Sequence, residues 1–176
     1  MLQQLKYFIQ DLKRITNKSL LRIVTLPFLR QVWGIGLYRI DRGFYLLIGK
    51  HYNIVRLIFM PIYNFIQALA NIEIHYKADI KGGFMILHPA VGVVISRYSI
   101  IGNNFTMTGG NVIGAKPGCQ HNEIIIGNFC SMGANATLIG PLKISNNIVI
   151  GASACVVNDC LVDDSILVGI PAKRIN

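Results

Sequence analysis

The sequence predicts a mainly β protein, in which a parallel β-helix of about five coils follows an α-helical N-terminal region. Two observations predict this fold class. From Ile74 onward, aliphatic residues recur every six positions, a spacing that fits neither the 3.6-residue period of a helix nor the two-residue alternation of a strand. Before that point, apolar residues follow helical spacing. We therefore expect a helical, basic region over residues 1–72 and a β-helix domain over residues 73–176.

The N-terminal region is expected to form three or four helices that pack on the first coil. Two apolar and basic stretches, residues 20–49 and 54–70, contain Pro27 and Pro61 as expected helix starts or kinks. A helix is also expected within residues 1–18, where the apolar residues with helical spacing are Leu2, Leu5, Phe8, Ile9 and Leu12.

The positive charge of the chain is concentrated in the same region. Of the net charge of +9, residues 1–72 contribute +8, from ten Lys and Arg against Asp11 and Asp41. A basic, apolar helical surface can lie on an anionic membrane leaflet. It can equally pack between subunits or domains, and the sequence leaves both alternatives open. No nucleic-acid-binding motif is present, so a nucleic-acid partner is not expected.

Composition excludes several other classes of protein. With 52% hydrophobic and 14% charged residues, the chain is not intrinsically disordered. The longest uncharged run, residues 57–72, is shorter than the roughly 20 apolar residues of a spanning helix, and no signal peptide is expected. The four cysteines form no CxxC pair, so we expect no metal site and no disulfide framework. A cytoplasmic location is the resulting expectation.

The six-residue period defines the expected coil. Each flat face of the helix points one aliphatic side chain inward, and three faces close a coil of about 18 residues. Stacked coils bury a continuous ladder that no single coil could bury. Small residues four places after an aliphatic one suit the crowded corners of the prism: Cys130, Ala136, Ala154 and Cys160. The expected inward positions are Ile74, Ile80, Ile86, Ile95, Ile101, Met107, Ile113, Ile126, Met132, Leu138, Ile144, Ile150, Val156, Val162 and Val168.

Two insertions interrupt the period, and each contains a histidine. The first lies between Ile86 and Ile95 and contains His88; the second lies between Ile113 and Ile126 and contains His121. Insertions into a solenoid form surface loops, which often carry function. These two loops are therefore the candidate functional site.

The hexads, the two insertions and the C-terminal segment VGIPAKRI (residues 168–175) resemble the left-handed β-helix acyltransferases. Within them the chain resembles the serine acetyltransferase branch, including its shorter relatives that O-acetylate bacterial polysaccharides. The resemblance covers residues 72–176 well and the helical region loosely. It implies a left-handed coil, a homotrimer, and acetyl-CoA bound without a metal in grooves between neighbouring subunits; a dimer of trimers is an open alternative.

The resemblance also implies catalytic residues. The segment LHPAVGVV (residues 87–94) is similar to the family segment that carries the general base, which makes His88 the expected base. Glu73, 15 positions earlier, stands where the family has an Asp that orients this histidine, and His121 matches a second histidine that helps to hold substrate. Imidazole titrates near neutral pH and so suits a base. The alternatives are a structural loop histidine for His88, a solvated charge for Glu73 and an ordinary exposed loop histidine for His121.

Acetyl-CoA is expected along surfaces with small side chains, and backbone amides near Gly114 are expected to stabilise the oxyanion. The same glycines could be simple turn residues. A covalent mechanism through Cys119 is disfavoured, His75 is expected to be structural, and no role is expected for His51. The expected cofactor-binding residues are Gly114, Ala115, Gly133, Ala134, Gly151, Ala152 and Lys173, the last of these near the CoA phosphates.

Two departures from the family pattern decide the expected acceptor. The aspartate that the family's helical domain contributes to serine binding has no matching position in residues 1–72. The Asp that serine enzymes carry immediately before the base, and use to hold the amino acid, is Leu87 in this chain. We therefore expect an O-acetyltransferase acting on a sugar hydroxyl of a bacterial surface polysaccharide or its precursor. The alternatives are a serine O-acetyltransferase of cysteine biosynthesis and a non-catalytic β-helix scaffold.

Overall fold

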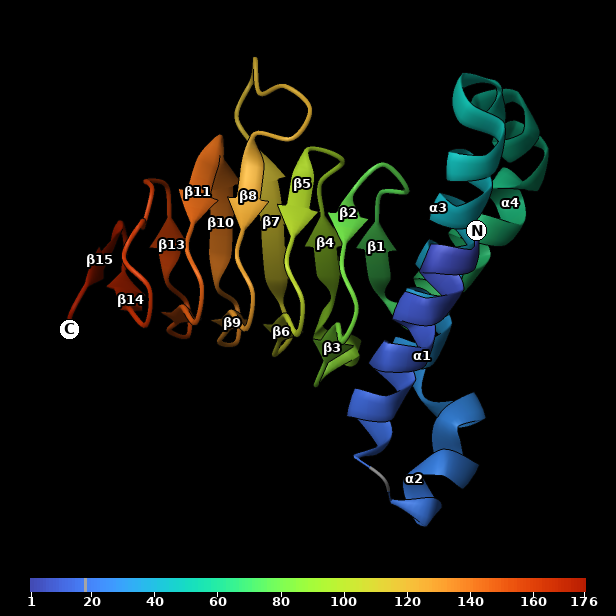
Figure 1. Cartoon of the computed structure of the whole chain (residues 1–176), viewed down its shortest axis with the longest axis horizontal. Coiled ribbons are helices and arrows are strands. Elements are labelled where there is room, and N and C mark those ends of the chain that lie inside the picture. The colour runs from blue at the N-terminus through green and yellow to red at the C-terminus, as the bar shows by residue number, and fades with distance from the viewer. Residues whose placement is uncertain (18) are drawn as a thin grey trace.

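The computed structural model describes residues 1–17 and 19–176, and it consists of a helical region followed by a β-solenoid (Figure 1). Two short 3-10 helices, Leu26–Phe28 and Gly49–His51, join the longer helices. The α-helices of the described residues are α1 (Leu2–Thr16), α2 (Leu20–Thr25), α3 (Arg30–Ile48) and α4 (Tyr52–Ala70).

The solenoid has three flat faces, each formed by one sheet. Sheet A has the order β1-β4-β7-β10-β13, sheet B the order β11-β8-β5-β2, and sheet C the order β15-β14-β12-β9-β6-β3. The strands are β1 (Ile72–Ile74), β2 (Asp79–Ile80), β3 (Met85–Ile86), β4 (Val93–Ile95), β5 (Ser99–Ile101), β6 (Thr106–Met107), β7 (Asn111–Ala115), β8 (Ile124–Ile126), β9 (Ser131–Met132), β10 (Thr137–Gly140), β11 (Leu142–Ile144), β12 (Val149–Ile150), β13 (Cys155–Val156), β14 (Ile166–Gly169) and β15 (Ala172–Arg174).

The strand register confirms the predicted coil. On sheet A, Ile74 pairs with Ile95 and Ile95 with Ile113, while Leu138 pairs with Ile113 and with Val156. The expected inward residues from Ile74 through Val156 are all buried, and they form one continuous hydrophobic core along the solenoid axis. The predicted fold class, a parallel solenoid of about five coils behind a helical region, is therefore confirmed.

The last two expected inward positions are wrong. Val162 is 53% exposed and Val168 is half-buried, whereas Cys160 and Leu167 occupy the inward positions. Cys160 bridges to Ile144, 16 residues earlier, and Leu167 pairs with Ile150, 17 residues earlier. The last coil is thus shorter than the 18 residues that separate Ile126 from Ile144. Among the described residues no further parallel strand pairs with this coil, so the pairings that fix the spacing of the inner coils act on it from one side only.

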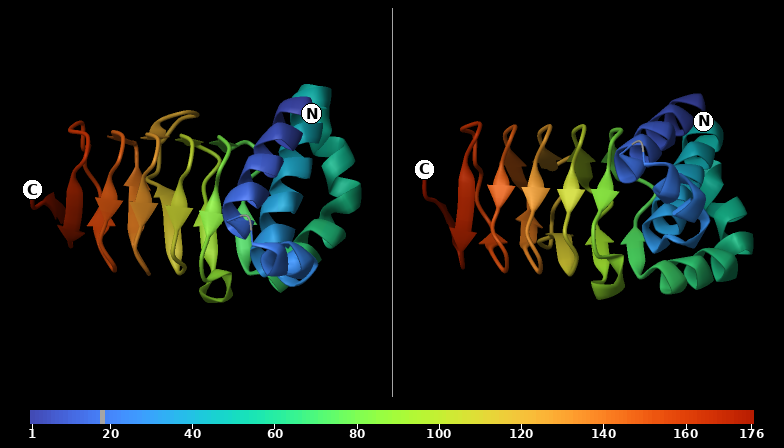
Figure 2. Two further views of the ribbon diagram at one scale, coloured as in Figure 1. Left: turned by 60° about the horizontal axis from the view of Figure 1, so that its bottom comes forward. Right: turned by 90° about the horizontal axis from the view of Figure 1, so that it is seen from below.

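The helices cover the first coil, at the opposite end of the solenoid from the C-terminus (Figure 2). Tyr38 of α3 donates its hydroxyl hydrogen to the Ala78 carbonyl at 2.8 Å and accepts a hydrogen bond from the Ile80 N–H at 3.1 Å. The side chain of Gln31 accepts a hydrogen bond from the Ile86 N–H. These side chains satisfy backbone groups of edge strands that have no earlier coil to pair with. The helices therefore take the place of a preceding coil.

The chain passes from helix to solenoid within two residues. Asn71 has a left-handed backbone conformation (φ 56°) and its N–H donates to the Gln67 carbonyl, which ends α4 at Ala70. Strand β1 begins at Ile72. Because Val93 N–H donates to the Asn71 carbonyl, the end of α4 is tied to the second coil at the position of the first insertion.

Candidate active site

The first insertion forms a short loop at the edge between sheets C and A, called here the His88 edge. His88 follows β3 and precedes a 3-10 helix (Pro89–Val91), and its side chain is exposed. Its N–H donates to the Thr108 carbonyl at 2.8 Å, and the Asn71 side-chain amide donates to the Ala90 carbonyl at 2.8 Å. The backbone that carries the imidazole is thereby fixed on both sides.

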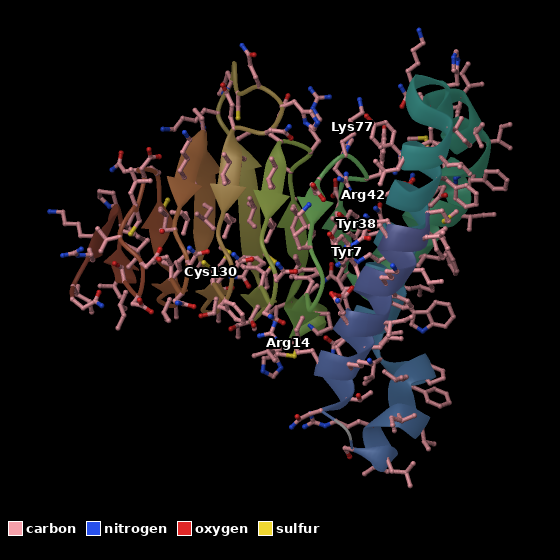
Figure 3. The ribbon with its side chains drawn as sticks, in the orientation of Figure 1. Tyr7, Arg14, Tyr38, Arg42, Lys77 and Cys130 are labelled. Atoms are coloured by element: carbon pink, nitrogen blue, oxygen red, sulfur yellow. The ribbon has the colours of Figure 1, made fainter. Side chains whose placement is uncertain are left out.

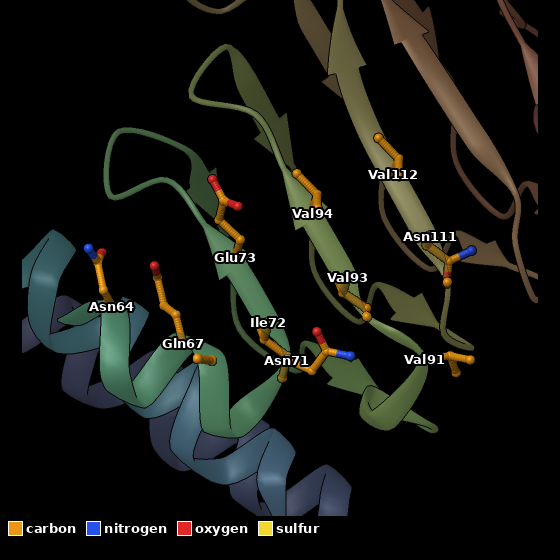
Figure 4. Close-up of a pocket in the computed structure, with 13 residues that line it drawn as sticks. Asn64, Gln67, Asn71, Ile72, Glu73, Val91, Val93, Val94, Asn111 and Val112 are labelled. Atoms are coloured by element: carbon orange, nitrogen blue, oxygen red, sulfur yellow. The ribbon is translucent and has the colours of Figure 1, made fainter. Parts of the chain in front are cut away.

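An open groove lies beside this loop, between α4 and the outer face of sheet A (Figure 4). Its volume is about 440 Å³. Its α4 side presents the amides of Asn64, Gln67 and Asn71, and its sheet side carries Glu73, the one acidic residue among those that line it. The groove thus offers hydrogen-bonding groups and one carboxylate above a floor of valines.

Glu73 does not contact His88 through a hydrogen bond in the described part of the chain. It lies exposed on β1, where it pairs in register with Val94, and it points outward from the sheet (Figure 4). His88 lies at the edge of the same face. The orienting role of Glu73 stays a prediction, and it requires a side-chain rotation toward the edge.

The second insertion lies at the edge between sheets A and B, called here the His121 edge, where it follows β7 (Figure 1). The Lys116 N–H donates to the Gly140 carbonyl at 2.8 Å, and the Gln120 N–H donates to the Glu123 carboxylate at 2.7 Å. These two hydrogen bonds fix the base and the tip of the loop and leave the His121 side chain exposed.

Cys119 of this loop is poorly suited to nucleophilic chemistry. Its side chain is buried, and burial raises the pKa of the thiol, with the Glu123 carboxylate raising it further. A thiol with a raised pKa carries little thiolate at neutral pH.

The two histidines lie at opposite edges of sheet A. Strand β7 crosses the face from Gly110 at the His88 edge to Lys116 at the His121 edge, a distance of about 20 Å at the rise of an extended strand. A small substrate cannot contact both imidazoles of one chain. If both histidines act on one substrate, they must come from two chains.

The expected cofactor-binding pairs are divided between the same edges. Gly133–Ala134 and Gly151–Ala152 each follow a strand of sheet C and so lie on the His88 edge, whereas Gly114–Ala115 ends β7 on the other. A Cβ at Gly133 would lie 2.6 Å from the Ala152 nitrogen, and a Cβ at Gly151 would lie 2.9 Å from Val168 Cγ1. Close stacking of coils therefore requires Gly133, because the nearby atom is backbone, whereas a side chain at Gly151 would need only Val168 to move; both constraints are independent of any ligand. Lys173 is exposed on β15.

The neighbouring histidine, His75, is held neutral. Its Nδ1 accepts a hydrogen bond from the Lys77 N–H at 3.1 Å, and its ring stacks on Tyr76. Burial lowers the pKa of His75 to about 4, and the positive charges of Arg56, Lys77 and Arg97 add to the shift. A histidine with this pKa is a weak general base near neutral pH, which fits the expected structural role.

The polar residues that α4 presents to the groove were missed by the sequence analysis. Asn64 and Gln67 are three residues apart and share one face of the last part of α4, and Asn71, which ends the helix, lines the same groove. That spacing was the available signal. It is overlooked when the three residues are treated only as interruptions of an uncharged run.

Comparisons with known proteins point to one kind of enzyme, although no family model matches the chain. The serine acetyltransferase of Bacillus subtilis is 32% identical over 154 residues, which are 86% of this chain and 65% of the relative. That of Helicobacter pylori (strain 26695) is 36% identical over 110 residues, 61% of this chain and 62% of the relative. That of Mycobacterium tuberculosis is 32% identical over 123 residues, 68% of this chain and 52% of the relative. The chain thus spans about half to two thirds of these relatives.

Solved structures show the same likeness over nearly the whole chain. The serine acetyltransferase of Neisseria gonorrhoeae superposes with a TM-score of 0.84 at 26% identity, covering 99% of this chain and 67% of that one. The complex of the same enzyme with serine gives a TM-score of 0.80 at 28% identity, covering 98% of this chain and 69% of that one.

These relatives contradict the predicted polysaccharide acceptor, because each of them is a serine acetyltransferase. The prediction rested on Leu87, which is 46% exposed beside His88, and on the lack of a match for a family aspartate in the helical region. A single position next to the base does not determine the acceptor when polar groups of α4 and the carboxylate of Glu73 also line the adjoining groove. By fold, repeat and sequence, the chain is similar to the hexapeptide-repeat acyltransferases, and among them to serine acetyltransferases.

Proposed function

We propose that the protein transfers the acetyl group of acetyl-CoA to the hydroxyl of L-serine. The observation that carries this proposal is the likeness to serine acetyltransferases, which in the Bacillus subtilis relative extends over 154 residues and in the Neisseria gonorrhoeae structure over 99% of this chain. Both alignments are long enough that they must include the two loops that carry His88 and His121. The proposed reaction yields O-acetylserine and CoA.

The proposed chemistry is a direct transfer. His88 accepts the proton of the serine hydroxyl as the oxygen attacks the thioester carbonyl. The carbon–sulfur bond then breaks, CoA leaves as the thiolate, and the thiolate takes the proton from the His88 imidazolium. Backbone N–H groups near Gly114 stabilise the oxyanion that forms between these steps. Exposure of the His88 side chain beside the groove supports this assignment.

Glu73 and the small residues of the His88 edge take supporting roles in the proposal. Glu73 orients the His88 imidazole after its carboxylate turns toward the edge. The pantetheine arm lies along Gly133–Ala134 and Gly151–Ala152, and Lys173 meets the CoA phosphates. Acetyl-CoA is an intracellular metabolite, so the proposal includes a cytoplasmic location.

The proposal also includes a homotrimer. His121 and the Gly114 amides lie at one edge of sheet A and His88 at the other, so a site that uses all of them needs edges from two chains. In a closed ring each chain offers its His88 edge to one neighbour and its His121 edge to the other. Three-sided prisms fit such a ring of three.

The test is release of the CoA thiol from acetyl-CoA by the purified full chain with L-serine as acceptor. Removing a general base costs typically 10²–10⁴-fold in rate. We expect His88→Ala to lose kcat on this scale with little change in the KM for acetyl-CoA. His51→Ala is the matched control, because His51 is an exposed histidine of the helical region far from the groove.

Two results would overturn the proposal. One is full activity in His88→Ala, which would remove the assigned base. The other is binding of acetyl-CoA without serine-dependent thiol release, which would make the chain a different acyltransferase. L-Threonine and free sugars serve as comparison acceptors in the same assay.

A further inference from the structure

The helical region presents an extended apolar surface on the side turned away from the solenoid. On α4 the exposed fractions of its outward residues range from 58% to 74%, and a stripe on α3 continues the surface. Figure 3 shows that the side chains on this side of the helices are mostly carbon. The outer apolar surface is defined as Trp33, Ile40, Phe44 and Leu47 of α3 together with Ile54, Leu57, Ile58, Ile62, Phe65 and Leu69 of α4.

Grooves connect the two helices into one surface. A groove of about 400 Å³ brings Trp33 of α3 together with Phe65 and Leu69 of α4. A second groove of about 420 Å³ continues along Trp33 and Ile40 toward α1. Contiguous apolar patches of this extent on a folded protein mark an interaction site.

The exposed charges of the helical region are of one sign. The two acidic residues of the helical region are both buried and paired: Asp11 with Arg39 at 2.9 Å, and Asp41 with Arg56 at 3.2 Å. The exposed ionic side chains that the structure describes in residues 1–17 and 19–70 are all cationic: Lys6, Lys13, Arg22, Arg30 and Lys50.

This combination identifies the occupant. If a second copy of the chain covered the surface through the same patch, it would bring cations against cations. An anionic lipid bilayer offers an apolar interior to the helices and negative headgroups to the exposed cations of the helical region, of which Arg30 lines the groove beside Trp33. Aromatic side chains such as Trp33 and Phe44 suit the boundary between these layers.

We propose that the helical region seats the protein on the surface of an anionic lipid bilayer, with the outer apolar surface facing the acyl chains. This inference rests on the helices alone and does not depend on the acetyl transfer proposed above.

The helices lie on the membrane in this proposal and do not cross it. Residues 30–70 are long and apolar enough to span a bilayer by length and composition. In the structure this stretch turns at Gly49–His51, and α3 and α4 pack side by side. Spanning would pull Arg39 and Arg42 away from Asp11 and Asp79, their partners at 2.9 Å, and would expose buried charges to lipid.

The experiment uses vesicles and a reporter that the chain already contains. Trp33 is the single tryptophan of the sequence and lies within the surface. The full chain is sedimented with vesicles of phosphatidylcholine alone and of phosphatidylcholine mixed with phosphatidylglycerol. We expect binding to the mixed vesicles with a blue shift of Trp33 emission, at least about tenfold weaker binding to phosphatidylcholine, and release by salt.

Two variants distinguish binding through the outer apolar surface from nonspecific adsorption to vesicles. Ile58→Glu places a carboxylate at an apolar side chain that is 74% exposed and should lower binding at least about tenfold. Leu161→Glu is the matched control, because Leu161 is 68% exposed in the last part of the solenoid and should leave binding unchanged. Circular dichroism and serine-dependent activity without vesicles report whether each variant folds.

Equal binding to both vesicle types, or loss of binding in Leu161→Glu as much as in Ile58→Glu, would overturn the proposal. The proposal would also be overturned if the parent protein did not bind vesicles and instead formed an oligomer in solution that Ile58→Glu dissociates. A second copy of the chain would then cover the surface.

Discussion

Arg39 and Asp11 form a buried ion pair that joins α3 to α1, with Arg39 Nε 2.9 Å from Asp11 Oδ2. The same guanidinium donates to the carbonyls of Ile80 and Lys81, and the same carboxylate accepts the Phe84 N–H at 2.8 Å. The pair therefore fixes two helices to each other and to the first coil beneath them.

Removal of this arginine should loosen the helices from the solenoid. Arg39→Met leaves the Asp11 carboxylate buried without its partner, which costs about 3–5 kcal/mol. Urea unfolding monitored by circular dichroism measures the loss. The control is Lys81→Met, which breaks the more exposed pair with Asp79 and should cost about 0–1 kcal/mol. Equal losses in both variants would contradict the assigned importance of the pair.

Stacking of the coils should be sensitive to substitution of Gly133 and should tolerate substitution of Gly114. A methyl group at Gly133 would lie 2.6 Å from the Ala152 nitrogen, so Gly133→Ala should destabilise the fold by about 1–3 kcal/mol. At Gly114 the nearest atom would be 3.5 Å away, an ordinary contact, and Gly114→Ala should change stability by less than about 0.5 kcal/mol. Thermal unfolding of the two variants side by side tests the difference.

His75 should make the fold sensitive to acid. Its pKa is about 4 when folded against 6.5 in the unfolded chain, so the unfolded state binds more protons between these values. Above pH 6.5 His75 has no effect on the pH dependence of the free energy of unfolding. As the pH falls from 6.5 toward 4, protonation of the unfolded chain lowers this free energy. His75→Asn keeps an acceptor for the Lys77 N–H and cannot titrate.

The variant should therefore lose less stability than the parent between pH 6.5 and pH 4, by about 1 kcal/mol because the ring is only partly buried. Melting temperatures across this range measure the difference, with His51→Asn as the exposed control. Burial raises the pKa of Asp11 to about 6, an effect of opposite sign that is common to all three proteins. Parallel curves for parent and His75→Asn would show that the folded ring titrates normally.

Leu87→Asp should strengthen serine binding. The resemblance to serine acetyltransferases places at this position a carboxylate that holds the amino acid, and a charge-assisted hydrogen bond contributes about 1.5–3 kcal/mol. We expect the KM for L-serine to fall about tenfold with an unchanged KM for acetyl-CoA. Leu87→Asn is the control, because its side chain has the size of Asp without the charge. Initial rates measured over a range of serine and acetyl-CoA concentrations give both KM values. A KM that rises would place the serine ammonium elsewhere in the groove.

Mixed chains should restore activity that each single variant lacks. If a site takes His88 from one chain and His121 from the next, then His88→Ala and His121→Ala proteins are each inactive on their own. Unfolding and refolding an equal mixture should make about a quarter of the sites complete in random trimers. The serine-dependent rate of the mixture measures this fraction. Activity that stays at the level of the single variants would place both histidines in one chain's site or outside the site.

The periodicity predicted the interior of the solenoid well because each inward position is fixed by the coils on either side. Ile101 and Ile126 pair with neighbours in both directions, so a change of spacing there would misalign two coils. The prediction failed at Val162 and Val168, where the final coil has a neighbour on one side and its length is free to change.

The candidate site was predictable in part. The insertions identified His88 and His121 but left open whether both histidines of one site come from the same chain. The signal was available, since the first insertion follows the third face of a coil and the second insertion follows a first face. The acceptor was not predictable from Leu87, because recognition depends on groups that the assembled site brings together from distant parts of the chain.

The reversed strand at the end of the solenoid has a consequence for filament formation. Sheet C ends in β15, which runs antiparallel to β14, while the first coil is covered by the helices. A parallel stack with two open ends could add further copies along its axis and grow as a fibre. Here an approaching copy meets helices at one end and, on sheet C, a strand of the wrong direction at the other, so this route to aggregation is obstructed at both ends.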